Sequence, residues 1–192
     1  MASLLPSMLY NVWKYLKNPV YREYQNAPST YKKTIFFSLL KWSLVFSLSV
    51  AILNSTFAEI LNLDLGEHAS EQLFSKYSIW VIFLFVSIIA PCLEEVLFRG
   101  PLVYFRDSPY FKFTFYTSIL LFGIVHIFNF QGDAQLYFFA PLLIAPQLIA
   151  GVFLGYIRVK LGLKWSILLH ASYNTILIGP VLLLKILNFP IE

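Results

Sequence analysis

Residues 79–105 read IWVIFLFVSIIAPCLEEVLFRGPLVYF, and this stretch decides the fold of the protein. It contains no charged residue before Glu94. A membrane hydrocarbon core of ~30 Å is crossed by about 20 helical residues, so the stretch is long enough to span a bilayer. Its apolar residues form a continuous run, which favours a helix over a membrane strand of alternating character. The stretch therefore predicts a transmembrane helix that carries Glu94, Glu95 and Arg99 below the membrane surface.

The rest of the chain has the same apolar character. Of its 192 residues, 58% are hydrophobic and 12% are charged, whereas about 25% are charged in ordinary soluble domains. The single cysteine, Cys92, excludes a disulfide-linked secreted scaffold. We predict an all-α, polytopic helical membrane protein with about five transmembrane helices, at residues 34–53, 79–98 (continuing to 105), 113–130, 136–159 and 165–187.

Prolines interrupt several of these stretches. Pro141 and Pro146 lie in the fourth, and Pro180 follows Gly179 in the fifth. Because each proline removes a backbone donor inside a helix, we expect kinks or broken helices there, and Pro91 is expected to bend the second helix.

Residues 1–33 have a different pattern. Apolar residues recur at helical spacing beside Lys14 and Lys17, which is typical of an amphipathic helix lying in the membrane interface. The apolar positions are Leu5, Leu9, Val12, Trp13 and Leu16. The segment lacks the cationic region and cleavage site of a signal peptide.

The basic residues predict the orientation, because Lys and Arg accumulate in cytoplasmic segments. With the N-terminus in the cytoplasm, all basic loop residues except Lys76 fall on that side: Lys14, Lys17, Arg22, Lys32, Lys33, Arg106, Lys112, Arg158, Lys160 and Lys164. The other side receives Glu59, Asp64, Glu67, His68, Glu71, Asp133 and Glu192. The net charge of +4 therefore reflects the basic residues on one side of the membrane and sets the expected orientation of the chain. We predict the lipid bilayer as a partner and no nucleic acid.

Charged residues inside a membrane helix usually face a cavity or a partner. Glu95 and Arg99 are spaced i, i+4 and can pair on one helix face, whereas Glu94 lies about 100° away round the helix. An unpaired carboxylate in a cavity is suited to act as a general base. Alternatively, the three residues mark a helix end at the cytoplasmic interface.

Two of the three histidines also fall within predicted spans. His126 follows Phe122 in FGIVH at 122–126, and His170 precedes Asn174 in HASYN at 170–174. Each alone is consistent with a packing or interhelical hydrogen-bonding role. At ~1.5 Å per residue, Glu94, His126 and His170 lie at comparable depths. Together the residues provide a base, hydrogen-bond donors and an ion pair, which are the parts of a hydrolytic site.

The motifs EEVLFR at 94–99, FGIVH at 122–126 and HASYN at 170–174 resemble, in order, the EExxxR, FxxxH and HxxxN pattern of the CPBP family. This family comprises the CAAX proteases and bacteriocin-processing proteins and is also called Abi. The resemblance covers about residues 75–190. It implies a peptidase core at 75–192, preceded by a first transmembrane helix with an external loop at 34–74 and the cytoplasmic N-terminal segment at 1–33.

The resemblance implies an intramembrane endopeptidase similar to type II CAAX prenyl endopeptidases, acting on a peptide or protein at the membrane. Glu94 and His126 would activate the attacking water, His170 and Asn174 would stabilise the oxyanion, and Glu95 and Arg99 would brace the site. Glu94, His126 and His170 could also ligate zinc, and a metal-free reaction remains open. We expect the site to open toward the cytosol of a bacterial plasma membrane.

Two other functions stay open from the residues alone. A non-catalytic scaffold or regulator of the same family would keep the motifs for structure, and a small transporter would use the buried charges as a relay. A buried thiol in an apolar helix is usually inert, so we assign Cys92 no catalytic role. Gly151 and Gly155 form a small-xxx-small pair, which favours close helix packing.

Overall fold

The computed structural model describes residues 7–62, 74, 76–130 and 134–187, which are arranged as helices joined by short turns. The α-helices are α1 (Ser7–Lys17), α2 (Ser29–Ile60), α4 (Ile79–Leu84), α5 (Ala90–Glu94), α6 (Phe111–Val125), α7 (Ala140–Leu143), α8 (Ala145–Leu161) and α9 (Leu163–Ile186). Between them lie π-helical turns η1 (Phe85–Ile89) and η2 (Glu95–Arg99) and 3₁₀ turns η3 (Gly100–Phe105), η4 (His126–Asn129) and η5 (Ala134–Phe139).

The described residues contain 4 helices that are long and apolar enough to cross a membrane, and a bent pair gives a fifth. The four are Ser29–Ile60, Ile79–Phe105, Phe111–Asn129 and Leu163–Ile186, and the pair is Tyr137–Leu143 with Ala145–Leu161. The predicted all-α polytopic membrane fold is confirmed. The first helix is longer than predicted, because it begins at Ser29 and continues to Ile60.

The prolines have three different effects. Tyr137–Leu143 and Ala145–Leu161 meet at an angle of 43°, so the break predicted near Pro141 and Pro146 is present. Pro91 stands at the start of α5, directly after the π-helical turn η1. At Pro180 the expectation of a break was wrong, because α9 runs through this residue without interruption, whereas a kink there stays a prediction.

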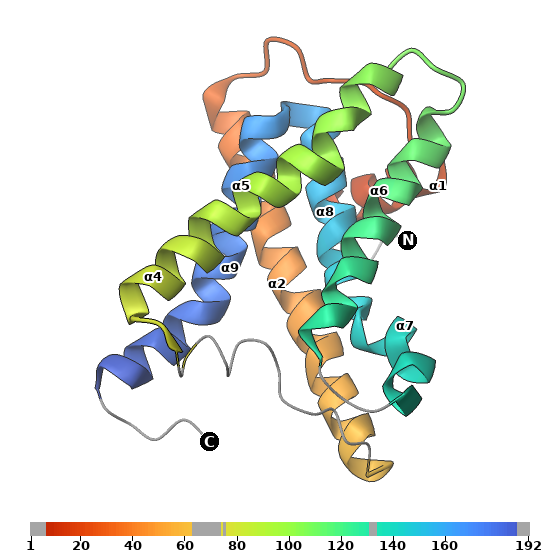
Figure 1. Ribbon diagram of the computed structural model, residues 1–192. Helices are drawn as coiled ribbons and strands as arrows, with labels where there is room; N and C mark the ends of the chain where they lie inside the picture. Colours follow the sequence, from red (N-terminus) through yellow and green to blue (C-terminus); the bar gives the residue numbers. More distant parts are fainter. Residues whose placement is uncertain (1–6, 63–73, 75, 131–133, 188–192) are drawn as a thin grey trace.

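The long helices run up and down through the bundle (Figure 1). The connection from α1 to α2, the turn before α6 and the turn at Gly162 gather at one end, which we call the basic end. It carries Lys17, Arg22, Arg106, Lys160 and Lys164. The other end is called the far end. The predicted acidic loop residues Asp64, Glu67, Glu71, Asp133 and Glu192, with His68, lie outside the described residues.

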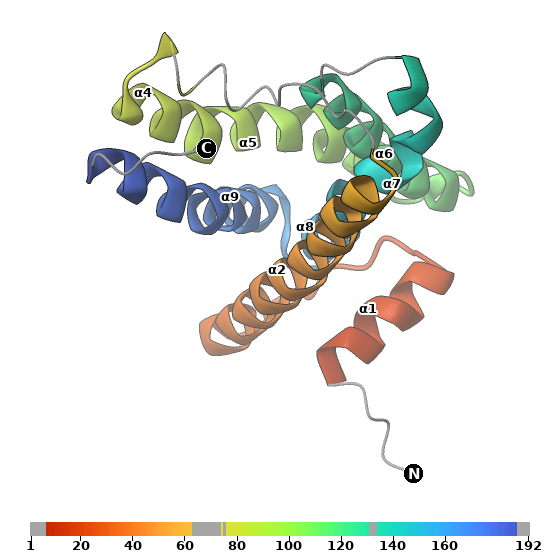
Figure 2. The ribbon, with the colours of Figure 1, turned by 90° about the horizontal axis from the view of Figure 1, so that it is seen from below.

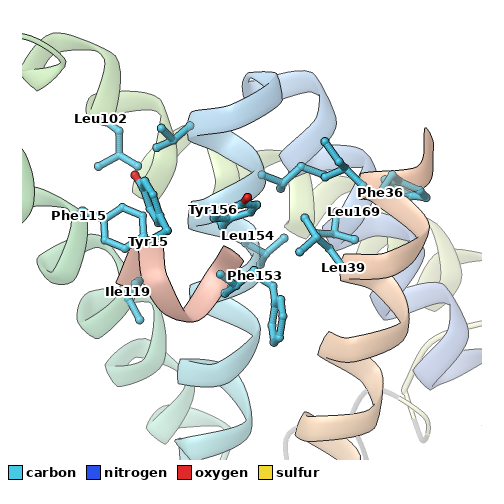
Figure 3. Close-up of a cluster of buried hydrophobic side chains, with 14 of the residues drawn as sticks. Tyr15, Phe36, Leu39, Leu102, Phe115, Ile119, Phe153, Leu154, Tyr156 and Leu169 are labelled. Carbon is cyan, nitrogen blue, oxygen red and sulfur yellow. The ribbon is translucent and has the colours of Figure 1, made fainter. Parts of the chain in front are cut away.

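Helix α1 packs on the bundle with the face that was predicted to lie in the membrane interface. Leu9, Val12 and Tyr15 are buried. The Tyr15 ring makes edge-to-face contacts with Phe115 and Tyr156, each with a centroid distance of 5.3 Å (Figure 3). The view from below shows α1 beside the outer side of the bundle (Figure 2). Much of the apolar face therefore contacts protein, while Trp13 remains exposed.

Two glycines allow α6 and α8 to approach each other. A Cβ added at Gly155 would lie 2.9 Å from Cε2 of Phe115, and one at Gly151 would lie 3.4 Å from Cδ1 of Phe122. The interpretation of this pair as a packing feature is confirmed. Close packing here matters because Phe122 also lines a cavity inside the bundle.

Replacing Gly155 by alanine is expected to destabilise the protein by about 1–3 kcal/mol, because overpacking forces a fully buried ring to move. The measurement is thermal unfolding in detergent. Gly179→Ala is the matched control, since nothing lies within 4 Å of its added Cβ and the helix is regular there. Equal unfolding temperatures for the two variants would contradict this account of the α6–α8 contact.

Candidate active site

Pro91 shapes the helix that carries the two glutamates. The Ala90 N–H bonds the Phe85 carbonyl in the i→i−5 pattern of a π-turn. The next carbonyl in this register, that of Val86, faces a proline that has no N–H to donate. Asn174 donates its Nδ2–H to this Val86 carbonyl at 2.9 Å. Asn174 therefore joins α9 to the glutamate helix at the point where that helix is irregular.

Glu95 is fully buried and has three partners. Its Oε1 lies 3.3 Å from Nη1 of Arg99 and 3.0 Å from Nδ1 of His170. Its Oε2 accepts a hydrogen bond from the Ser166 hydroxyl. The Glu95–Arg99 pair predicted from the i, i+4 spacing is thus present, and α9 supplies the other two partners.

Arg99 is completely buried as well. Apart from its ion pair with Glu95, its guanidinium makes no hydrogen bond within the described part of the chain. The guanidinium carbon lies 3.9 Å from the ring centroid of Phe122, in a cation–π contact. Aromatic rings and one carboxylate therefore hold this charge in place.

Glu94 lies on a different face of the helix, and its side chain is 29% exposed. Its Oε2 is 3.7 Å from Nε2 of His170. Because Nδ1 of the same ring contacts Glu95, His170 stands between two carboxylates. The arrangement separates a fully paired glutamate, Glu95, from a more open one, Glu94.

His126 has a defined orientation. Its Nδ1 lies 2.7 Å from the Phe122 carbonyl, four residues earlier. A carbonyl accepts only, so Nδ1 carries the proton and Nε2 of the neutral ring holds a lone pair. The His126 and His170 rings both make edge contacts with Phe122, at centroid distances of 4.8 Å and 5.5 Å. The ring of Phe122 therefore sets the positions of both imidazoles.

These side chains meet at a cavity of about 310 Å³. Its lining includes Glu94, His126, His170 and Asn174, whereas Glu95 and Arg99 lie behind the wall. The rest of the lining is Phe85, Val86, Ala90, Phe122, Asn129, Gln147, Ala150, Tyr173, Leu177 and Ile178. Four of the six predicted site residues thus share the cavity, and the other two support it.

The cavity extends away from the basic end. At ~1.5 Å per residue, Glu94 and His170 lie ~16 Å and ~10 Å from the basic ends of their helices, whereas the lining residues Val86 and Asn129 lie ~28 Å and ~27 Å away. Behind Glu94, Glu95 and Arg99 are fully buried. The lining therefore extends from Glu94 away from the basic end, and the expected opening toward the cytosol stays a prediction.

The candidate metal ligands do not form a complete ligand set. No group of three or more His, Cys, Asp or Glu side chains among the described residues could hold a metal ion. Glu94 and His170 come close, but the arrangement with His126 does not fit a zinc site. We therefore derive no reaction step through a metal.

Arg158 and Lys160 lie within α8 and are buried, although the sequence placed them in a cytosolic loop. Arg158 donates from Nε to the Arg99 carbonyl at 3.0 Å and from Nη1 to the Tyr21 hydroxyl at 3.1 Å. Lys160 donates to the Arg22 carbonyl at 3.2 Å. The N-terminal segment therefore covers these charges and is linked through Arg158 to the helix of the site.

Ser166 is one residue at the site that the sequence analysis missed, and the lining residues Asn129, Gln147 and Tyr173 were not predicted either. Ser166 lies four residues before His170 and so shares its helix face, which is the signal that could have identified it.

Cys92 does not line the cavity. Lys41 is exposed on α2 beside the Trp42 ring, and Lys185 donates to the Phe74 carbonyl.

Comparison with known proteins identifies the family of the chain. The family model described as type II CAAX prenyl endopeptidase Rce1-like matches residues 76–176, just over half of the chain. The UPF0177 protein YaiF of Lactococcus lactis is 38% identical over 95 residues, which cover 50% of this chain and 38% of that protein. No solved structure matches the chain.

The matched residues contain all three motifs and the helices that carry them, from Lys76 to the middle of α9. The chain belongs to the Rce1-like family of type II CAAX prenyl endopeptidases. With its apolar helices, it is an integral membrane protein.

Replacing Arg99 by leucine is expected to destabilise the protein by about 3–5 kcal/mol, because it leaves the Glu95 carboxylate buried without its charge partner. Arg106→Leu is the control, since the Arg106–Asp107 pair is largely exposed and such pairs contribute about 0–1 kcal/mol. Thermal unfolding of both variants in detergent measures the difference. An Arg99→Leu protein as stable as Arg106→Leu would show that this buried pair contributes little.

Proposed function

We propose that this protein is an intramembrane endopeptidase that hydrolyses a peptide bond with water activated by Glu94 and His126. The observation that carries the proposal is the shared cavity, in which a carboxylate and two imidazoles line one space. The family match supports a protease at this site. Proteolysis needs a base for water and a donor for the oxyanion, and the cavity contains side chains of both kinds.

The first step is addition of water to the scissile carbonyl. Glu94 accepts a proton from the water while Nε2 of His126 accepts a hydrogen bond that orients it. The water oxygen forms a bond to the carbonyl carbon, and the carbonyl π electrons move to its oxygen. In the second step the C–N bond breaks, and the leaving nitrogen takes the proton from Glu94. Atoms and charge balance without a further reactant.

His170 is suited to stabilise the oxyanion. In its protonated form it donates Nδ1–H to Glu95 and presents Nε2–H beside Glu94. The partners of Glu95 fix the position of the ring, because Ser166 and Arg99 hold the same carboxylate. Asn174 uses one N–H on the Val86 carbonyl, which leaves its second N–H for the oxyanion.

We place the protein in a bacterial plasma membrane with its N-terminus in the cytoplasm. Basic residues at one end of the bundle support this orientation. The relative from Lactococcus lactis supports a bacterial source. The substrate is then a peptide precursor or a membrane protein that has access to the bilayer.

The test is a comparison of peptide termini in membranes that contain wild-type protein or the Glu94→Ala variant. We expect a set of new carboxyl termini that requires Glu94, because the variant has no group to accept the proton of water. Glu59→Ala, at an exposed position near the end of α2, is the control and should retain all products. Identical termini with wild type and Glu94→Ala would contradict the peptidase and favour a scaffold.

A further inference from the structure

A second cavity adjoins the candidate active site. It has a volume of about 350 Å³ and shares Gln147, Tyr173 and Leu177 with the first cavity. One wall comes from α2 and includes Ser47 and Asn54. This helix lies outside the residues that match the family. The second cavity therefore depends on a part of the chain to which no function has been assigned.

Two residues that line these cavities have an amide oxygen without a hydrogen-bond partner in the described part of the chain. Asn54 is 7% exposed; its Nδ2 donates to the Leu142 carbonyl, and its Oδ1 makes no hydrogen bond with the described residues. Oε1 of Gln147 is buried and unpaired in the same way. Buried polar atoms nearly always have hydrogen-bond partners. A ligand that supplies donors would satisfy both oxygens.

The chemistry of the two oxygens selects the kind of ligand. Both are acceptors, so the ligand has to present N–H or O–H groups. An extended polypeptide presents backbone N–H groups at regular intervals, whereas a lipid acyl chain has none. The apolar neighbours Leu48, Leu143 and Leu177 suit the side chains of a segment taken from a membrane.

The second cavity lies on the side of Glu94 that is distant from the basic end. At ~1.5 Å per residue, Ser47 and Asn54 lie ~27 Å and ~37 Å from the start of α2 at the basic end. Pro146 and Gln147 belong to the start of α8, which is also distant from the basic end. Both cavities therefore extend from Glu94 toward the far end.

On the basis of the proposed peptidase function, we infer that an extended polypeptide segment of the substrate enters from the far end and binds along the two cavities. Its backbone N–H groups donate to Oε1 of Gln147 and Oδ1 of Asn54. The scissile bond then reaches Glu94 in the first cavity. Gln147 and Asn54 are binding residues that determine affinity for the substrate.

The first experiment measures kcat/KM on one membrane substrate that has been identified by its Glu94-dependent product. Gln147→Leu is expected to lower kcat/KM about fivefold to tenfold, as loss of one backbone hydrogen bond does, mainly through KM. Its unfolding temperature should not fall, because Oε1 has no partner to lose. Asn54→Leu is the second variant. The control is Ser43→Ala, which is buried on α2 but lines neither cavity.

The outcomes separate the two proposals. If Gln147→Leu and Asn54→Leu cleave like wild type while Glu94→Ala is inactive, the inference is overturned and the peptidase stands. If Glu94→Ala also cleaves like wild type, the proposed function itself fails. A fall in kcat/KM through a higher KM for both variants, with Ser43→Ala unchanged, supports the binding site.

The second experiment needs no catalysis. In a Cys92→Ser background, Gln147→Cys and Ser43→Cys are treated with a membrane-impermeant sulfonated methanethiosulfonate from either side of sealed vesicles. Gln147→Cys is expected to react at least tenfold faster from the far side, and Ser43→Cys slowly from both. Faster reaction of Gln147→Cys from the basic side, or equal rates from both sides, overturns entry from the far end.

Discussion

The buried ion pair between Glu95 and Arg99 is the interaction on which the rest of the site depends. Removing both charges from water costs several kcal/mol per ion, and only a partner and well-placed hydrogen bonds offset this cost. Here Glu95 has partners from two helices, with Arg99 on its own helix and Ser166 and His170 on α9. The network orients His170 and leaves Glu94 for the cavity. Removal of any partner would therefore disturb the positions of His170 and Glu94 at the cavity.

The π-helical turns in the helix that carries the glutamates also help to hold the site together. The π-turn before Pro91 exposes the Val86 carbonyl, which binds Asn174, and the turn Glu95–Arg99 places the Arg99 carbonyl where Arg158 reaches it. π-helical turns of this kind are frequent at functional sites. Two side chains from α8 and α9 thus bind backbone groups of the helix that carries the glutamates. The irregular helix becomes part of the packed structure.

The sequence predicted the helices and the side chains that meet at the first cavity, because charge is rare in apolar spans and i, i+4 spacing places residues on one face. It did not predict that Asn174 binds the Val86 carbonyl, since this contact arises from backbone geometry at Pro91. It also misplaced Arg158 and Lys160, because their aromatic and carbonyl partners come from the N-terminal segment, far away in sequence. The direction of the cavity depends on helix packing, which no local pattern reveals.

The central claim is that water, activated by Glu94, is added to a peptide bond inside the bundle. The most direct measurement uses purified protein in lipid vesicles with one substrate in H₂¹⁸O, and mass spectrometry of the new carboxyl terminus. The account predicts one ¹⁸O atom in the product of the wild-type protein and no product with Glu94→Ala. Product formed by Glu94→Ala at the wild-type rate would contradict it.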